Sequence, residues 1–385
     1  MNSSRSIPRP QTAASTGSQA IVPLTEVAVT GVGLACTTGD RPFALYGAVA
    51  THLSSSTPHH DFSGNGGSGG SAADIRLLIA AVPEVEDLDT PQERIISLAG
   101  SALKQTMNFL PQNIQDLEGK DILVLTLLPE AATERGGSLN RNQLQTALTN
   151  QHSSLATACF RFAGPDQGAV LQLQKACAEL IEGKWQVVLF GGADSLADVV
   201  TASLVQNNSA MLQKDAGGVV LGEGAAFLLL QKCNPSKPSS EFRSIGAMAA
   251  SEEPHAGKED HHMTGLATAL RNTLATAQLS PAAIKSIVLP LDGNIADELE
   301  WHQTVETIWS RRDNIPRKFE ELRPYLSLGD TGAATLPLAL VLASARLDFR
   351  FPSVNNVFVC EITHHCPRGV VYLKAPTAQG KNDSL

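Results

Sequence analysis

The segment GGVVLGEGAAFLLLQK, residues 217–232, carries the clearest fold signal in the chain. Its apolar residues run almost without interruption on both sides of Gly222-Glu223-Gly224. Continuous apolar runs of this kind are typical of strands that are covered on both faces of a sheet. The pattern therefore predicts two buried strands that are separated by a break at the glycines.

Similar apolar runs alternate with amphipathic stretches along the rest of the chain. The predicted strands are 27–33, 121–128, 185–192, 286–293 and 368–375, and the predicted helices are 91–108, 168–183, 265–278, 296–309 and 329–346. This alternation predicts an α/β fold with parallel or mixed sheets that are covered by helices on both faces. The Gly- and Ser-rich segment 53–73 should form a mobile loop.

The composition suits a large core and limits the kinds of partner. The chain has 385 residues, of which 43% are hydrophobic, enough for one big domain or for two halves that share an interface. Its net charge of −9 argues against a nucleic-acid or anionic-membrane partner. We interpret a basic run at 310–323 as a solvated loop, with a docking patch for an acidic partner as the alternative.

The cysteines and the N-terminal segment indicate the compartment. Six cysteines are scattered without a disulfide pattern, which predicts reduced thiols in the cytoplasm. No apolar run approaches the ~20 residues that a membrane span needs. Residues 1–24 should form a disordered tail rather than a transit peptide, because their prolines leave no amphipathic helix pattern.

Four stretches resemble the β-ketoacyl-ACP synthases of the thiolase fold. They are VAVTGVGLACTTGDRPFALYGAV (27–49), EGKWQVVLFGGADS (182–195) with Gly191 and Gly192, the segment 217–232 with Gly222, Glu223 and Gly224, and HHMTGLATAL (261–270). The resemblance implies two similar halves in a layered α-β-α-β-α architecture. Their expected bounds are 25–240 and 241–376, with a second tail at 377–385.

Synthases of this family need a cysteine at the N-terminus of a buried helix, where free amides and the helix dipole activate the thiol. Counting back from Gly191-Gly192 at the family's spacing places Asp166 at that position. An aspartate is a poor acyl carrier but a good helix N-cap, which is our interpretation of it. Cys159 is a rival nucleophile, but it requires a seven-residue insertion before the helix, and a structural cysteine is favoured.

The family's remaining catalytic positions also depart from its pattern. The two histidine positions are occupied by Asp292 and Asp330, and the lysine position by Tyr325. The glycine-rich closing loop reads CEITHHCPRG (360–369), which puts His364 and His365 at the gate of the substrate channel, together with Thr264. We expect no metal there, because adjacent His364, His365 and Cys366 cannot all face one ion.

These departures predict a protein without condensing activity. Decarboxylation builds negative charge on the substrate oxygen, and losing a single donor to that oxygen costs ~10²–10³ in rate. The resemblance then points to the chain-length factors of type II polyketide systems, which lack the active cysteine and pair with an active ketosynthase. Two alternatives remain open: an acyltransferase or condensing enzyme that uses Cys159, and a homodimeric scaffold that binds acyl chains.

We therefore expect an acyl channel shaped jointly with a ketosynthase partner, and no cofactor. Acyl carrier protein should dock mainly on the partner, since this chain is itself acidic. Four basic residues offer a second docking surface: Arg311, Arg312, Arg317 and Lys318. The pathway, whether polyketide or fatty-acid-like, and the choice between homodimer and heterodimer stay open.

Overall fold

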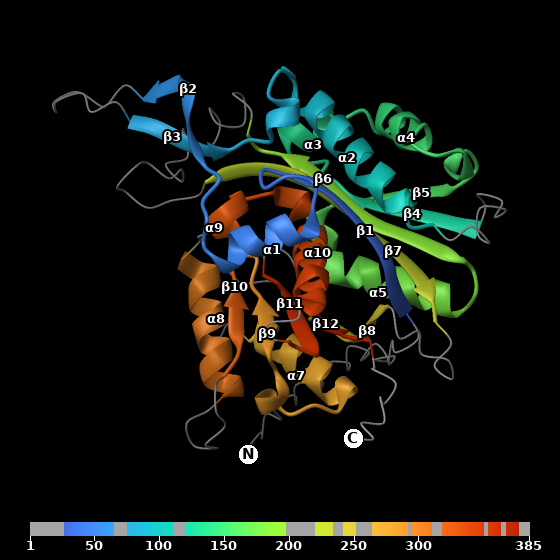
Figure 1. Ribbon diagram of the computed structural model, residues 1–385, viewed down its shortest axis with the longest axis vertical. Helices are drawn as coiled ribbons and strands as arrows, with labels where there is room; N and C mark the ends of the chain where they lie inside the picture. The colour runs from blue at the N-terminus through green and yellow to red at the C-terminus, as the bar shows by residue number, and fades with distance from the viewer. Residues whose placement is uncertain are drawn as a thin grey trace, which may run out of the picture.

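The computed structural model describes residues 27–64, 75–110, 121–197, 220–233, 242–251, 264–291, 295–309, 318–349, 353–362 and 367–376. Within these ranges helices and sheets alternate in layers in the order helix, sheet, helix, sheet, helix (Figure 1). This is the layered α/β architecture that the sequence predicts. No helix in the described ranges has both the length and the apolar character that crossing a membrane requires.

The first sheet is formed by strands from the N-terminal part of the chain. Its order is β1 (Val27–Cys36), β7 (Leu221–Lys232), β6 (Val187–Ser195), β4 (Ile122–Leu127) and β5 (Cys159–Ala163). β1 and β6 run antiparallel to β7, whereas β4 runs parallel to both β5 and β6. A hairpin of β2 (Thr57–Gly64) and β3 (Ile75–Ala80) joins the side of β7 through β3.

The second sheet comes from the C-terminal part of the chain. Its order is β8 (Arg243–Ser251), β12 (Arg368–Lys374), β11 (Asn356–Glu361), β9 (Ser286–Val288) and β10 (Glu320–Leu322). β1 pairs with β8 as well as with β7, so the ladder of strands passes without a break from one sheet to the other. The predicted boundary near residue 240 lies outside the described residues, as do the two predicted tails.

The helices fill the space around and between the sheets. α2 (Pro91–Met107), α3 (Glu134–Ser138) and α4 (Arg141–Thr149) cover the first sheet, while α7 (Gly265–Ala277) and α8 (Ile295–Ile308) cover the second. α5 (Ala169–Ile181) and α10 (Thr335–Asp348) contact strands of both sheets, and α1 (Pro42–Ala50) and the short α9 (Tyr325–Leu328) lie beside them. α10 is buried from Leu336 to Leu347, as expected for a helix that is apolar on all sides.

Most of the predicted elements are confirmed. The helices α2, α5, α7 and α8 begin and end within two residues of the predicted bounds. The predicted strand 286–293 is shorter and ends at Val288, just before Pro290. The predicted helix 329–346 begins only at Thr335, because Gly332 has a positive φ of 51° and residues 332–334 form a 3₁₀ turn.

Two predictions about segments are wrong. Residues 57–64, which we expected to be part of a mobile loop, form β2, because β3 supplies a pairing partner that composition does not reveal. The expected break at Gly222-Glu223-Gly224 is also absent, and β7 runs through it. A Cβ at residue 222 would lie 2.1 Å from the carbonyl oxygen of Leu328. The glycine therefore allows the backbone at Leu328 to lie close to β7 and does not mark a turn.

Candidate functional site

The entrance to helix α5 is where the sequence resemblance to β-ketoacyl-ACP synthases predicts a nucleophile position. A 3₁₀ turn, Pro165–Gln167, precedes the helix and closes with the amide of Gly168 donating to the carbonyl of Pro165 at 2.8 Å. Gly168 then takes a φ of 74°, and the helix begins at Ala169. The predicted capping role of Asp166 is therefore wrong. This residue is exposed in the turn, and Gly168 holds the N-cap position without a side-chain cap.

The head of α5 receives its cap from a distant strand instead. Glu361, the last residue of β11, accepts hydrogen bonds from the amides of Ala169 at 2.5 Å and Val170 at 2.9 Å. Only 3% of Glu361 is exposed. Free amides at a helix N-terminus attract anions, and here a carboxyl group of the protein itself engages two of them.

The surroundings of Glu361 affect its protonation. Burial raises its pKa to about 7, against the opposing effect of its two backbone hydrogen bonds and of Arg368. Arg368 is fully buried and donates to Glu300 at 2.8 Å and Asp297 at 3.0 Å. The interior behind the helix head thus holds three carboxyl groups around this arginine.

The cavity at this site is small. It is lined by Leu127, Pro165, Ala169, Pro290, Gly332, Ala333, Thr335, Leu336 and Glu361, and its volume is about 10 Å³. That volume suits about one water molecule. None of these lining residues is a cysteine, histidine or lysine, so the described lining offers no thiol and no imidazole.

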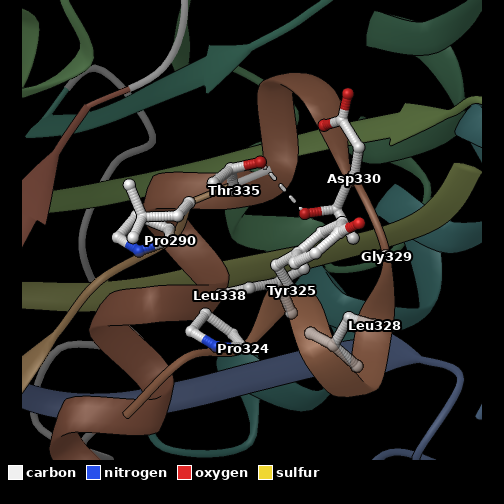
Figure 2. A pocket seen from close by; sticks show the side chains of 10 residues that line it. Pro290, Pro324, Tyr325, Leu328, Gly329, Asp330, Thr335 and Leu338 are labelled. Carbon is white, nitrogen blue, oxygen red and sulfur yellow. Dashed lines mark hydrogen bonds between the residues drawn. The ribbon is translucent and has the colours of Figure 1, made fainter. Parts of the chain in front are cut away.

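Asp330 lies in the turn that leads into α10. Its amide donates to Val220 at 2.7 Å, its carbonyl accepts from Gly222 at 2.8 Å, and its side chain accepts from the amide of Gly332 at 2.8 Å. Figure 2 shows Tyr325 beside Asp330 and Thr335 around a second cavity of about 20 Å³. The backbone contacts of Asp330 hold the turn against β7, and its carboxyl group accepts from the amide of Gly332 within the turn.

The structure brings only some of the predicted site residues together. Asp292, His364, His365, Arg311, Arg312 and Arg317 lie outside the described residues, and Lys318 is exposed at the edge of a described range. Thr264 directly precedes α7 and makes no side-chain cap to it. Among the described residues no group of three or more His, Cys, Asp and Glu side chains is arranged to hold a metal ion.

None of the cysteines in the described part of the chain lies at the head of α5. Cys159 is half-buried at the first position of β5, opposite Leu123, and the helix head follows the other end of that strand. At ~3.3 Å per residue, the strand alone separates the thiol from that end by ~13 Å. Burial raises the pKa of Cys177 and Cys360 to about 12, so both remain unreactive thiols.

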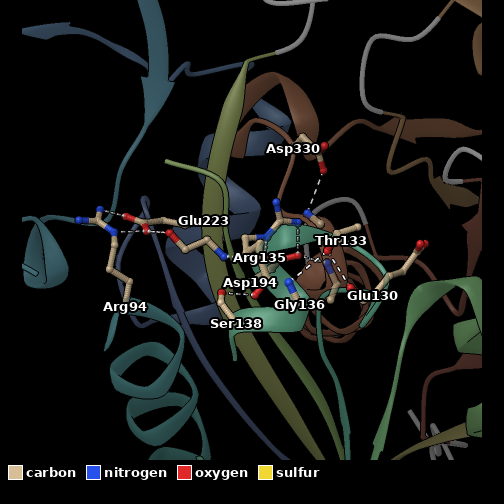
Figure 3. Close-up of polar contacts among 12 residues, drawn as sticks. Arg94, Glu130, Thr133, Arg135, Gly136, Ser138, Asp194, Glu223 and Asp330 are labelled. Atoms are coloured by element: carbon tan, nitrogen blue, oxygen red, sulfur yellow. Dashed lines mark hydrogen bonds and ion pairs between the residues drawn. The ribbon is translucent and has the colours of Figure 1, made fainter. Parts of the chain in front are cut away.

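Two ion pairs with buried carboxyl groups explain the acidic residues of the glycine motifs (Figure 3). Glu223 is fully buried and accepts from Arg94 at 2.6 and 2.8 Å, from the amide of Val82 and from the hydroxyl of Ser195. Asp194 accepts from Arg135 at 2.8 Å and from the amide of Ala333 at 2.9 Å. These contacts tie α2, α3 and the turn before α10 to the strands of the first sheet.

Gly191 and Gly192 allow neighbouring elements to pack closely against β6. A Cβ at residue 192 would lie 2.5 Å from the carbonyl oxygen of Ala333, and one at residue 191 would lie 2.2 Å from the ring of Phe227. Sequence reasoning identified the glycines but missed Asp194 and Glu361 as site residues. The sequence did hold a sign of both residues, because each carboxyl group ends or interrupts an apolar strand. A buried carboxyl group in such a place needs a hydrogen-bond donor or a cation beside it.

No protein-family model and no curated protein sequence matches the chain. Solved structures do match its fold. The ishigamide ketosynthase/chain length factor has a TM-score of 0.71 at 14% sequence identity, covering 92% of this chain and 100% of its own. AntDE:AntF, a type II polyketide synthase acyl-carrier protein in complex with its hexaketide-bound ketosynthase, has a TM-score of 0.68 at 13% identity with the same coverage.

A third match is the β-ketoacyl synthase from Burkholderia phymatum STM815, with a TM-score of 0.63 at 14% identity, covering 92% of this chain and 100% of its own. All three matches are ketosynthases or carry ketosynthase-like chains. The chain therefore has the thiolase-like fold of ketosynthases, which confirms the fold expected from its sequence motifs.

Proposed function

We propose that this protein is a non-catalytic, ketosynthase-like subunit of the chain-length-factor type. It pairs with an active β-ketoacyl-ACP synthase in type II polyketide or fatty-acid-like biosynthesis and helps to shape the channel for the growing acyl chain. Acyl carrier protein docks mainly on the active partner. The structural matches support a ketosynthase-like frame, and two of them are a ketosynthase/chain length factor and a carrier-protein complex.

The observation that carries the proposal is the contact between Glu361 and the head of α5. In a condensing enzyme the amides at this position stabilise negative charge that develops on the substrate. Here the amides of Ala169 and Val170 already bind a carboxyl group. A thioester oxygen would have to displace Glu361 and then develop its charge beside it, which opposes the transition state.

Intact-mass spectrometry after incubation with an acyl thioester, such as octanoyl-CoA, tests the lack of catalysis. We expect no acyl adduct on the wild-type protein and the same result for Cys159→Ala. An adduct on the wild type that is missing from Cys159→Ala would contradict the proposal and favour the acyltransferase alternative.

Co-expression tests the partnership. We expect the chain to co-purify with a type II ketosynthase that retains its cysteine and both histidines, and the pair to form longer products than the ketosynthase alone. A ketosynthase variant without its active cysteine should still co-purify but form no product. Equal product from the pair and from the ketosynthase alone would contradict a role in shaping the channel.

A further inference from the structure

We propose that the outer face of α1 binds the same face of a second copy of this chain, with the two helices antiparallel about a two-fold axis at Gly47. This pairing goes beyond the proposed function and does not depend on it. The exposure, the charge and the symmetry of this short helix support the pairing.

α1 is almost wholly apolar, although it lies at the surface of the molecule. Its inner face is buried and contacts α10, α9 and β1 (Figure 1). Its outer face is formed by Phe43, Ala44, Gly47 and Ala50, and all four are exposed. A helix that is apolar on all sides is normally covered on all sides. Since the outer face is open in the described structure, we infer that another molecule covers it.

Large apolar side chains lie at both ends of α1. Phe43, in the first turn, is 54% exposed, and Leu53, just beyond the end of the helix, is 60% exposed. The amide of Ser55 donates to the carbonyl of Ser327 at 3.2 Å, which holds the segment after α1 against α9. Leu326, which directly precedes Ser327 in the chain, is also exposed. Single exposed apolar residues are normal, whereas a group of them marks an interaction site.

The charge of this segment favours a second copy over other occupants. Residues 42–57 contain no Asp, Glu, Lys or Arg, in a chain of which 17% of the residues are charged and whose net charge is −9. A strongly acidic or basic partner would find no opposite charge on these residues. Two copies of an acidic chain normally repel each other, but at α1 they can meet without placing like charges together.

The outer face is also symmetric about Gly47. Ala44 and Ala50 each lie three residues from Gly47, and with about 3.6 residues per turn they lie at equal angles on either side of it. In an antiparallel two-fold pair, each Ala44 therefore faces Ala50 of the second copy. Each Phe43 then reaches the far end of the other α1, beside Leu53. A Cβ at residue 47 would meet no atom of its own chain within 4 Å, so a second helix can approach there.

Sedimentation equilibrium of the full chain tests the pairing. α1 has nine residues and is only ~14 Å long, so we expect a weak association with a Kd on the order of 10 µM. The mass of the wild type should double as its concentration rises through this range. Phe43→Glu should raise the Kd of this step at least about tenfold, because it places a charge at each end of the pair. Phe109→Glu alters a phenylalanine of similar exposure, 52%, at the end of α2, and should leave the Kd unchanged.

Charges of opposite sign test the two-fold register. Ala44→Glu and Ala50→Lys each place an unpaired charge in the interface, and each should associate more weakly than the wild type. Their equimolar mixture should form a 1:1 pair more tightly than either variant alone, because the two new charges then face each other. Residues six apart are not neighbours on one helix, so this rescue can come only from the second copy.

Circular dichroism melts establish that each variant is folded. Equal masses for the wild type and Phe43→Glu at all concentrations, or a mixture that associates no more tightly than its components, overturns the inference. Neither result bears on catalysis or on the pairing with a ketosynthase. Conversely, an acyl adduct in the mass experiment would overturn the proposed function and leave the pairing of α1 intact.

Discussion

The carboxyl group of Glu361 does for helix α5 what a capping side chain usually does from the residue just before a helix. Gly168 has no side chain with which to cap, so the amides of Ala169 and Val170 depend on a strand that lies about 190 residues away in the sequence. Glu300 repeats this arrangement at α7, where it accepts from the amide of Leu266 at 3.1 Å. Each of these carboxyl groups therefore links two elements.

Removing the carboxyl group should expose the dependence of α5 on Glu361. We expect Glu361→Ala to lower the free energy of unfolding by about 2–3 kcal/mol, because two buried amides lose their acceptor. Urea unfolding monitored by circular dichroism measures the loss. Excess sodium formate should restore part of it in Glu361→Ala but not in the wild type, with sodium chloride at equal ionic strength as the control. A variant that formate does not stabilise would contradict the anion-binding role of the helix head.

The protonation of Glu361 should appear in the pH dependence of stability. Its folded-state pKa is about 7, raised from 4.5 by burial, so the folded protein holds this proton more tightly than the unfolded chain. The tighter binding of this proton adds to the free energy of unfolding. This added stability is fully present below pH 4.5 and is lost as the pH rises to about 7. We expect the free energy of unfolding of the wild type, minus that of Glu361→Gln, to fall by at most about 3 kcal/mol over this range. A difference that rises with pH would show that the helix amides outweigh burial.

At the scale of elements, the glycines of β7 fix the distance between the strand and the turn before α10. A Cβ at Gly222 would lie 2.1 Å from the backbone oxygen of Leu328, and backbone cannot move aside as a flexible side chain can. Gly47 in α1 is the opposite case, because a Cβ there meets no atom within 4 Å. Two Gly→Ala substitutions in one protein can therefore have opposite effects.

We expect Gly222→Ala to lower the free energy of unfolding by about 1–3 kcal/mol through overpacking. Gly47→Ala should raise it by about 0.5–1 kcal/mol, because alanine loses less backbone freedom in a helix. Thermal and urea unfolding of both variants against the wild type provide the measurement. Similar changes in the free energy of unfolding for the two variants would show that the close approach of the turn to β7 does not affect stability.

The elements were largely predictable from local patterns. The periodicity of α2 and the continuous apolar residues of β4 and β6 express rules that act within a few residues. The error at β7 has a different origin, because glycine marks both a turn and a close approach, and only the neighbouring chain distinguishes them. The same holds for β2, whose composition resembles a loop and whose strand depends on β3.

At the scale of the whole molecule, the motifs predicted the layered fold, whereas the site depends on contacts that no local pattern contains. Asp166 follows the rules for an N-cap, yet a 3₁₀ turn moves the start of the helix to Ala169. Glu361 lay within the closing loop that the resemblance identified, but its contact with α5 joins segments from the two halves of the chain. Long-range pairing of this kind follows from the assembled layers and from no single stretch of residues.

The Glu361 contact also limits how a condensing enzyme could be designed on this fold. A thiol installed by Ala169→Cys alone would share its amides with an existing carboxyl group, and a neighbouring negative charge raises a thiol pKa instead of lowering it. Deleting Glu361 alone leaves bare amides and a less stable helix. The two substitutions are useful only when they are made together, so a designer who screens single variants will discard both.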